Sequence, residues 1–231
     1  MLRLLKAAWI LFWAISLTLL LFFPIVIAAL LGKQGNAAFH GTQIYAWIIL
    51  KVCGIRLKVR GKENIEPGQR YVILSNHASY LDPPALVLAL GLQFRWVIKK
   101  EVRKVPLFGL ALEASRNLFI DRSKGSDALD SIKRGVAQLP DNTSVLIFPE
   151  GTRSWDGKML PFKKGGFVIA KDGQLPILPV SIRGSHQRLP KGRAAFSRGE
   201  IEIVIHPPVA TGDLSLDDLM TDVRNSIASS L

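Results

Sequence analysis

Residues 71–84 read YVILSNHASYLDPP, and this stretch decides the fold. Its first five residues are almost entirely apolar, which is typical of a buried strand. Asp82 is followed by two prolines and marks the start of a helix, because aspartate caps helix N-termini and proline is tolerated in the first turn. A buried strand, a short loop and a helix in direct succession are the repeating unit of an α/β domain.

The same alternation continues from residue 55 to the end of the chain. Strands are predicted at residues 55–59, 71–75, 94–98, 118–120, 144–148, 177–182 and 200–205. Helices are predicted at residues 82–90, 126–139, 167–171 and 216–231, with short helical pieces between 99 and 113. This alternation predicts an α/β fold with a mixed, largely parallel sheet flanked by helices. Ligands of such sheets bind beyond the carboxyl ends of the strands.

A long apolar segment precedes this domain. Residues 7–31 are 25 consecutive uncharged, mostly apolar residues. A helix of that length covers about 37 Å, enough for a hydrocarbon core of about 30 Å. Pro24 should kink this helix. A cleaved signal peptide is the alternative, but its apolar region is usually only about 7–15 residues long. An uncleaved membrane anchor is therefore predicted.

A second, weaker apolar stretch at residues 37–50 leaves two arrangements open: a membrane span, or a helical hairpin that enters the bilayer and returns. We expect residues 1–52 to form a membrane-anchoring helical segment and residues 53–231 to form the α/β domain. The basic residues from Lys51 onward predict that this domain lies on the cytoplasmic side of the cell inner membrane or an equivalent cytoplasmic membrane.

Composition narrows the function classes. The 231-residue chain carries 30 Lys+Arg against 18 Asp+Glu, a formal net charge of +12. A nucleic-acid binder would explain that charge, but it would also show a recognisable motif or aromatic residues interleaved with bases. Attraction to an anionic leaflet explains the charge more simply. Cys53 is the one cysteine, which excludes an internal disulfide framework. A zinc hydrolase needs three protein ligands, and the four histidines lack ligand spacing, so no metal is expected.

His77 and Asp82 form the first candidate site. His77 lies just past the predicted strand at 71–75, and Asp82 follows five residues later. A loop of that length can fold back so that the carboxylate accepts a hydrogen bond from the imidazole, which makes the other ring nitrogen a better base. A structural hydrogen bond or a helix cap is the alternative for such a pair.

Cationic and acidic residues follow three more predicted strands. Lys99, Arg122 and the segment Glu150-Gly151-Thr152-Arg153 each stand just past a strand end. Arginine suits a phosphate because its planar fork donates two parallel hydrogen bonds. An Arg153–Glu150 ion pair that only holds a turn is the alternative. Together these strand ends predict a basic crevice for a phosphate-bearing ligand beside His77.

Four blocks of sequence, in a fixed order, carry a family resemblance. They are Asn76-His77-x4-Asp82, Asn117-Leu118-Phe119-Ile120-Asp121-Arg122, Phe148-Pro149-Glu150-Gly151-Thr152-Arg153-Ser154 and Leu178-Pro179-Val180. These blocks resemble those of the glycerolipid acyltransferases, and among them the bacterial 1-acyl-sn-glycerol-3-phosphate (lysophosphatidic acid) acyltransferases. The resemblance covers roughly residues 55–205, and the leader is similar to that family's membrane-anchoring helices.

The resemblance implies an enzyme that transfers a fatty acyl group from a thioester to the free sn-2 hydroxyl of 1-acylglycerol-3-phosphate, making phosphatidic acid. His77 would be the general base, and Asp82 would orient it and stabilise the imidazolium. Lys99 matches a lysine that helps to stabilise the oxyanion. The acceptor-binding residues that the resemblance implies are Arg122, Glu150, Gly151, Thr152 and Arg153.

The same resemblance implies the partners. The donor would be an acyl thioester of acyl carrier protein or coenzyme A, with no covalent acyl-enzyme, no other cofactor and no nucleic acid, and the enzyme would work on a phospholipid bilayer. Another lysolipid acceptor, such as a lyso-ornithine lipid, and a non-enzymatic membrane-anchored binder of anionic ligands are the alternatives. Arg116 departs from the pattern, because the second block often begins with glycine there. That change would alter the acceptor pocket or add a surface base.

Overall fold

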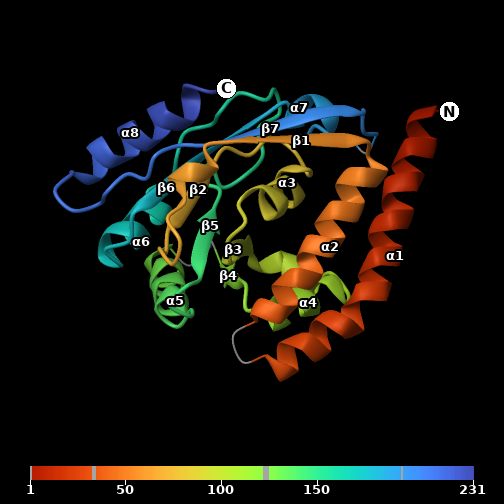
Figure 1. Ribbon diagram of the computed structural model, residues 1–231, viewed down its shortest axis with the longest axis horizontal. Coiled ribbons are helices and arrows are strands. Elements are labelled where there is room, and N and C mark those ends of the chain that lie inside the picture. The colour runs from red at the N-terminus through yellow and green to blue at the C-terminus, as the bar shows by residue number, and fades with distance from the viewer. Residues whose placement is uncertain (1, 33–34, 122–124, 194) are drawn as a thin grey trace.

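The computed structural model describes residues 2–32, 35–121, 125–193 and 195–231 (Figure 1). Within these residues the strands are β1 (Ile55–Arg60), β2 (Val72–Ser75), β3 (Phe94–Lys99), β4 (Leu118–Ile120), β5 (Ser144–Ile147), β6 (Ile177–Arg183) and β7 (Gly199–Ile205). The α-helices are α1 (Leu2–Leu31), α2 (Asn36–Val52), α3 (Asp82–Ala89), α4 (Phe108–Ala114), α5 (Gly125–Ala137), α6 (Gly165–Asp172), α7 (Ser185–Arg188) and α8 (Leu216–Ala228). Short 3₁₀ helices are η1 (Lys62–Asn64) and η2 (Lys100–Lys104).

The described strands form one seven-stranded sheet in the order β1-β7-β6-β2-β5-β3-β4. Neighbouring strands from β6 through β4 all pair in parallel, whereas β7 runs antiparallel to β6 and pairs in parallel with β1. The predicted mixed, largely parallel sheet is therefore confirmed. Because β6, β2, β5, β3 and β4 point the same way, their carboxyl ends lie along one edge of the sheet.

Helices cover both faces of the sheet, and alternating side chains of each strand enter two separate cores. In β2, Val72 and Leu74 pack with α5, α6 and α8, whereas Ile73 packs with α1, α2 and α3. All three side chains are fully buried. Figure 1 shows the same three layers, with α5, α6 and α8 on one side and α2 and α3 on the other. The continuous apolar run of β2 is thus explained by burial on both faces.

The two N-terminal helices form a hairpin beside the domain (Figure 1). In α2 one face is buried against the domain, including Phe39, Ala46 and Leu50, so the second apolar stretch is a packing helix. Trp9 of α1 donates its indole N–H to the carbonyl of Val52 at 3.2 Å, which ties the start of α1 to the end of α2. The two helices thus form a hairpin, and its placement relative to a bilayer stays a prediction.

Most of α1 faces outward. Among the described residues, Arg3–Leu31 is the one helix long and apolar enough to cross a membrane, with a mean hydropathy of 2.7 and 11% of its most apolar window buried. Pro24 lies inside this continuous helix, which bends toward its C-terminal end in Figure 1. The exposed apolar side chains of α1 include Leu4, Leu5, Leu11, Phe12, Ile15, Leu19, Leu20, Phe23, Ile27, Leu30 and Leu31. This exposed apolar surface is far larger than the apolar patches on the water-facing surface of a soluble protein.

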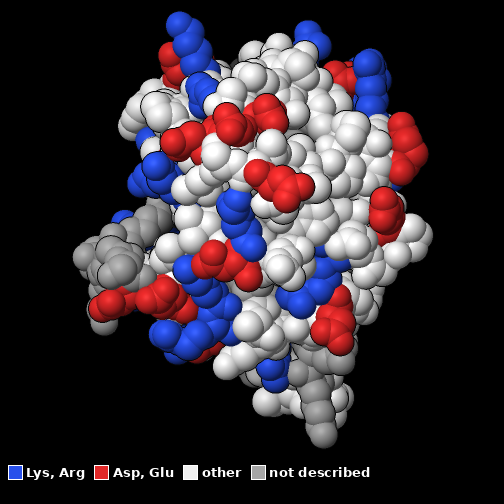
Figure 2. Space-filling view, turned by 90° about the vertical axis from the view of Figure 1, so that its left-hand side faces the viewer, with Lys and Arg blue, Asp and Glu red and all other residues white. Residues whose placement is uncertain are grey.

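The opposite side of the molecule is typical of a solvated surface. Figure 2 shows the side of α5, α6 and α8, where Lys and Arg are interspersed with Asp and Glu. Lys133 of α5 pairs with Asp172 of α6 at 2.5 Å, and Lys164 pairs with Asp217 of α8 at 3.6 Å. Charges of both signs on this face argue against a nucleic-acid surface there.

Candidate active site

Asn76 fixes the end of β2. Its side chain donates to the carbonyl of Ile182 at 2.9 Å and accepts from the Ile182 amide at 2.7 Å. The amide side chain thus replaces a pair of ladder hydrogen bonds where β2 leaves the sheet, and Asn76 is buried. The following residue, His77, therefore leaves the carboxyl edge of the sheet in a defined direction.

His77 and Asp82 are brought together as the sequence predicts. His77 Nδ1 lies 2.8 Å from Asp82 Oδ2, and the same oxygen accepts the amides of Ala78 at 2.8 Å and Ser79 at 2.7 Å. The Asp82 side chain is fully buried, whereas that of His77 is 16% exposed. Because a carboxylate faces Nδ1, this nitrogen is the donor and Nε2 is left with its lone pair. A neutral imidazole held in this way can accept a proton at Nε2.

The helix-capping interpretation of Asp82 is wrong. Leu81 occupies the N-cap position of α3 without a side-chain cap, and Asp82 is the first helical residue. The Asp82 carboxylate turns back to the preceding loop amides instead of the first helical turn. Its hydrogen bonds thus shape the His77 loop, which gives it a structural role beside the contact with the imidazole.

An aromatic ring lies flat on the His77 imidazole. The rings of His77 and Phe148 are 3.8 Å apart between centroids, with 8° between their planes. Trp96 of β3 stacks with Phe148 at 5.7 Å and 29°. Phe148 follows directly after β5, so the contact joins the ends of adjacent parallel strands.

Glu150 links the two strand ends through backbone amides. Its Oε1 accepts the His77 amide at 2.6 Å, and its Oε2 accepts the Leu160 amide at 2.7 Å. The residue is only 3% exposed. Burial, together with the nearby Asp82 carboxylate, raises the pKa of Glu150 to about 7, although its two backbone hydrogen bonds and Arg224 oppose the rise. Glu150 therefore organises the loops around His77.

Gly151 allows the chain to turn immediately after this carboxylate. Its φ of 73° lies in the left-handed region that favours glycine. A Cβ at this position would also approach the Lys163 side chain to 3.1 Å. Any side chain here would therefore strain the turn that presents Thr152 and Arg153.

Arg153 is held by an aromatic face and not by Glu150. Its guanidinium carbon lies 3.4 Å from the centre of the Tyr80 ring. No Arg153–Glu150 ion pair exists within the described part of the chain, so the turn-holding alternative is wrong. Among the described residues, Arg153 Nη1 is buried and has no hydrogen-bond partner. Stacking on Tyr80 thus orients the guanidinium, and its buried Nη1 is left without an acceptor among the described residues.

A basic segment that follows β6 holds the Arg153 turn in place. Lys191 donates to the Arg153 carbonyl at 2.9 Å and to Thr152 Oγ1 at 3.2 Å. The amide of Ser154 donates to the His77 carbonyl at 3.0 Å. The predicted residues Thr152 and Arg153 are therefore in the same assembly of loops as His77.

The described residues that follow β3 and β4 lie outside this assembly of loops. Lys99 is 54% exposed and pairs with Glu101 at 3.2 Å. Asp121 pairs with Lys100. Arg122, the predicted phosphate ligand, lies outside the described residues. The structure thus brings together these predicted site residues: His77, Asp82, Glu150, Gly151, Thr152 and Arg153. Among the described residues, no hydrogen bond joins Lys99 to this group.

Arg116 adopts the backbone conformation that its position demands. Its φ is 58°, in the left-handed region where a side chain is strained. The glycine often found at this place in the resembling family is thereby explained. Burial, together with the positive charge of Arg116, lowers the pKa of Arg95 to about 10.

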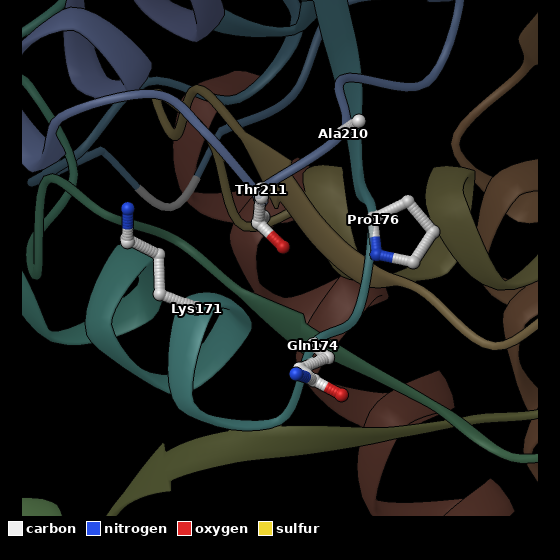
Figure 3. A pocket seen from close by; sticks show the side chains of 6 residues that line it. Lys171, Gln174, Pro176, Ala210 and Thr211 are labelled. Carbon is white, nitrogen blue, oxygen red and sulfur yellow. The ribbon is translucent and has the colours of Figure 1, made fainter.

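Figure 3 shows a depression elsewhere on the molecule, of about 340 Å³, lined by Lys171, Gln174, Pro176, Ala210, Thr211 and Gly212. It lies where the chain enters β6, at the amino ends of the parallel strands, and none of the predicted site residues lines it. The described residues contain no cluster of three or more His, Cys, Asp or Glu that could hold a metal ion. The candidate site residues that the structure describes thus lie at the carboxyl edge of the sheet and not at this depression.

Comparisons with known proteins decide the family. The acyltransferase family model matches residues 56–183. A 1-acyl-sn-glycerol-3-phosphate acyltransferase of Limnanthes douglasii is 34% identical over 208 residues, which cover 90% of this chain and 71% of that protein. The chain belongs to the acyltransferase family.

Two further relatives of this chain carry the same printed activity. The 1-acyl-sn-glycerol-3-phosphate acyltransferase of Saccharomyces cerevisiae is 32% identical over 84% of this chain, which spans 65% of that protein's length. The human 1-acyl-sn-glycerol-3-phosphate acyltransferase alpha is 37% identical over 75% of this chain, which spans 63% of its length. The family resemblance of the four sequence blocks is thus confirmed.

A solved structure shares nearly the whole fold. The crystal structure of the 1-acyl-sn-glycerophosphate (LPA) acyltransferase PlsC from Thermotoga maritima superposes with a TM-score of 0.86 at 27% identity. The match covers 99% of this chain and 94% of the Thermotoga protein. It therefore extends over the N-terminal helices as well as the sheet.

Sequence reasoning missed the parts of the site that act through packing. Phe148 and Trp96 lie next to site residues along the chain, but no spacing predicts a ring stack between two strand ends. No pattern in the sequence indicates that the Tyr80 ring supports Arg153. Lys191 stands in a stretch, residues 184–199, that contains four bases and no acid, and this charge pattern is the signal that could have found it.

Proposed function

We propose that this acyltransferase transfers a fatty acyl group from a thioester to the free sn-2 hydroxyl of 1-acylglycerol-3-phosphate and so makes phosphatidic acid. The observation that carries the proposal is the buried Asp82 carboxylate on His77 Nδ1, at the strand edge that also presents Arg153. The printed names of the yeast, human and Limnanthes relatives and of the Thermotoga structure support the choice of acceptor.

The proposed reaction needs one base and no covalent enzyme intermediate. His77 Nε2 takes the proton of the acceptor hydroxyl while that oxygen attacks the thioester carbonyl carbon. The tetrahedral intermediate then collapses, the carbon–sulfur bond breaks, and the leaving thiolate takes the proton from the imidazolium. Asp82 stabilises the positive charge of that imidazolium because its carboxylate lies 2.8 Å from Nδ1. The products are the ester and the free thiol.

The acceptor phosphate is proposed to bind the guanidinium groups of Arg153 and Arg122. A guanidinium donates charge-assisted, parallel hydrogen bonds to phosphate oxygens. Stacking of Arg153 on Tyr80 orients that fork before the ligand binds. Gly151 and Thr152 shape the turn, and Glu150 holds it to the His77 loop. Lys99 is proposed to reach the oxyanion.

The N-terminal segment, residues 1–52, is proposed to anchor the domain of residues 53–231 to the cytoplasmic face of a membrane. The outward apolar face of α1 supports this placement, since the lysolipid acceptor resides in the bilayer. The donor is proposed to be acyl carrier protein or coenzyme A carrying the acyl thioester, delivered from the aqueous side.

A product assay tests the proposal. Purified full-length protein in mixed micelles is given 1-acylglycerol-3-phosphate with a radiolabelled acyl thioester of either carrier, and the lipid product is separated. We expect labelled phosphatidic acid and an equal amount of free thiol. Labelled ester formed only with lyso-ornithine lipid would assign a different acceptor. Absence of labelled ester with every acceptor and both donors would contradict the enzymatic proposal.

A further inference from the structure

We infer that Phe148 is a positioning residue for His77: its ring fixes the plane of the imidazole and stabilises the imidazolium that forms when His77 takes a proton. This inference rests on the proposed function, in which His77 is the base. It is carried by the face-to-face contact of the two rings, with 3.8 Å between centroids and 8° between planes.

The sheet itself builds this contact. β5 lies between β2 and β3, so the ring that follows β5 stands between the ring that follows β2 and a ring on β3. Phe148 therefore has His77 on one side and Trp96 on the other, the latter at 5.7 Å and 29°. Trp96 in turn meets the fully buried Phe94 edge-on at 5.1 Å. The core thus supports Phe148 from behind and keeps it against the imidazole.

Asp82 alone cannot fix the imidazole. The hydrogen bond to Nδ1 holds one point on the edge of the ring, and the ring can still tilt about that point. A flat contact over the whole face removes the tilt. The direction of the Nε2 lone pair toward the acceptor hydroxyl is therefore set by Asp82 and Phe148 together. A misplacement of about 1 Å at a reacting group can cost about 100-fold in rate.

The same contact acts on the charge of the base. An aromatic face attracts a cation within about 6 Å of its centre, and the attraction strengthens where water is excluded. His77 is 16% exposed, so its imidazolium forms in a partly desolvated site. Asp82 meets this cation at the ring edge and Phe148 meets it at the ring face. The two contributions are therefore distinct, and a substitution can remove one without the other.

Substitutions of full-length protein separate positioning from packing. Phe148→Leu keeps apolar bulk but removes the ring, and we expect kcat to fall about 10- to 100-fold while the KM of each substrate stays within about twofold. Phe148→Tyr retains the face, so we expect it to recover most of the wild-type kcat. Trp96→Leu leaves Phe148 present but unsupported, and we expect a smaller loss of kcat.

Phe108→Leu is the matched control. Phe108 is a half-buried aromatic residue of α4, whose ring lies 6.3 Å from that of Tyr45 and tilted by 47° to it. Phe108→Leu removes the same atoms as Phe148→Leu, but from the contact between α4 and α2. We expect Phe108→Leu to keep the wild-type kcat. A thermal melt of the same preparation records any change in its melting temperature.

Nuclear magnetic resonance of histidine-labelled protein gives a readout independent of turnover. A ring stacked on the imidazole shifts the His77 ring-proton resonances upfield, and His77→Ala assigns them. We expect Phe148→Leu to abolish that shift and Phe148→Tyr to keep it. The resonances of His40, His186 and His206 should be unchanged in both variants.

Several outcomes would overturn the inference. They are a wild-type kcat in Phe148→Leu, a Phe148→Tyr variant as slow as Phe148→Leu, and unshifted His77 resonances in the wild-type protein. If His77→Ala is inactive while Phe148→Leu is fully active, the positioning role alone fails. If His77→Ala is itself active, His77 is not the base, and the proposed function fails in that form.

Discussion

The backbone amide of His77 donates a hydrogen bond to the Glu150 carboxylate at 2.6 Å, which ties the loop after β2 to the loop after β5. The other Glu150 oxygen accepts the Leu160 amide. One buried carboxylate thus sets the distance between His77 and the turn that carries Arg153. Glu150, from the block at residues 148–154, thus helps to hold the loop of the block at residues 76–82.

Glu150 makes stability depend on pH in a definite direction. Burial, aided by Asp82, raises its pKa in the fold to about 7 from the model-compound value of 4.5. The folded state then binds more protons than the unfolded state between these values, so the contribution is favourable below about pH 4.5 and is lost as the pH rises to about 7. The loss amounts to about 3 kcal/mol. Glu150→Gln cannot titrate and should not show it.

Unfolding of wild-type and Glu150→Gln protein at pH 5 and pH 8 checks this expectation. The variant should be the less stable at pH 5, because its amide nitrogen cannot accept the second backbone hydrogen bond. The difference between the two proteins should shrink toward pH 8. A difference that is the same at both pH values would contradict the assigned pKa shift.

Arg153 should govern affinity for the acceptor. Arg153→Lys keeps the charge but loses the fork and the stack on Tyr80, so we expect the KM of the lysophospholipid to rise about 10-fold, and more for Arg153→Ala. The KM of the thioester should change much less, because the acceptor phosphate is not part of the donor. Arg193→Lys, at an exposed position of the same basic segment, is the control. Steady-state kinetics in which each substrate is varied separately decides, and equal effects on both substrates would remove the phosphate assignment.

Arg116→Gly should stabilise the protein. The left-handed φ of 58° costs a side chain about 1 kcal/mol, and the substitution also removes repulsion from Arg95. We expect Tm to rise by about 2–4 °C, measured by a thermal melt. Arg134→Gly, an exposed site inside α5, should lower Tm instead, since glycine costs about 1 kcal/mol in a helix. A fall in Tm for both variants would show that the Arg116 side chain makes a net favourable contribution.

The apolar face of α1 should hold the protein on membranes. Leu19 and Leu20 are 56% and 68% exposed, and a lysine in the centre of a membrane helix costs about 2.5–3.5 kcal/mol. We expect the wild-type protein to stay with membranes through a carbonate wash and the double variant Leu19→Lys, Leu20→Lys to be partly released. Leu231→Lys, at an exposed apolar site outside α1, should behave as wild type. Release of the wild-type protein by carbonate alone would contradict the anchor.

The fold followed from local sequence, because apolar runs and helix signals are short-range patterns. The strand predicted at 71–75 is β2, the one predicted at 118–120 is β4, and their parallel order places the motifs on one edge. The predicted strand at 144–148 ends at Ile147, since Phe148 leaves the ladder to stack on His77.

The site was predicted as a set of residues but not as a set of contacts. His77 and Asp82 are five residues apart, so their hydrogen bond could be inferred from loop length. Glu150 binds an amide 73 residues away, and no local pattern reports such a partner. Asp82 at a helix start suggested a cap, although the loop amides compete successfully for its carboxylate.

Acyl transfer by His77→Ala, relative to the wild type under saturating donor and acceptor, tests the central claim most directly. General-base assistance contributes about 10²- to 10⁴-fold, and we expect the variant to fall below about one hundredth of wild-type turnover while it retains the wild-type melting profile. His40→Ala, at an exposed histidine of α2, should keep full activity. Turnover of His77→Ala above about a tenth of the wild-type value would contradict the assignment of His77 as the base.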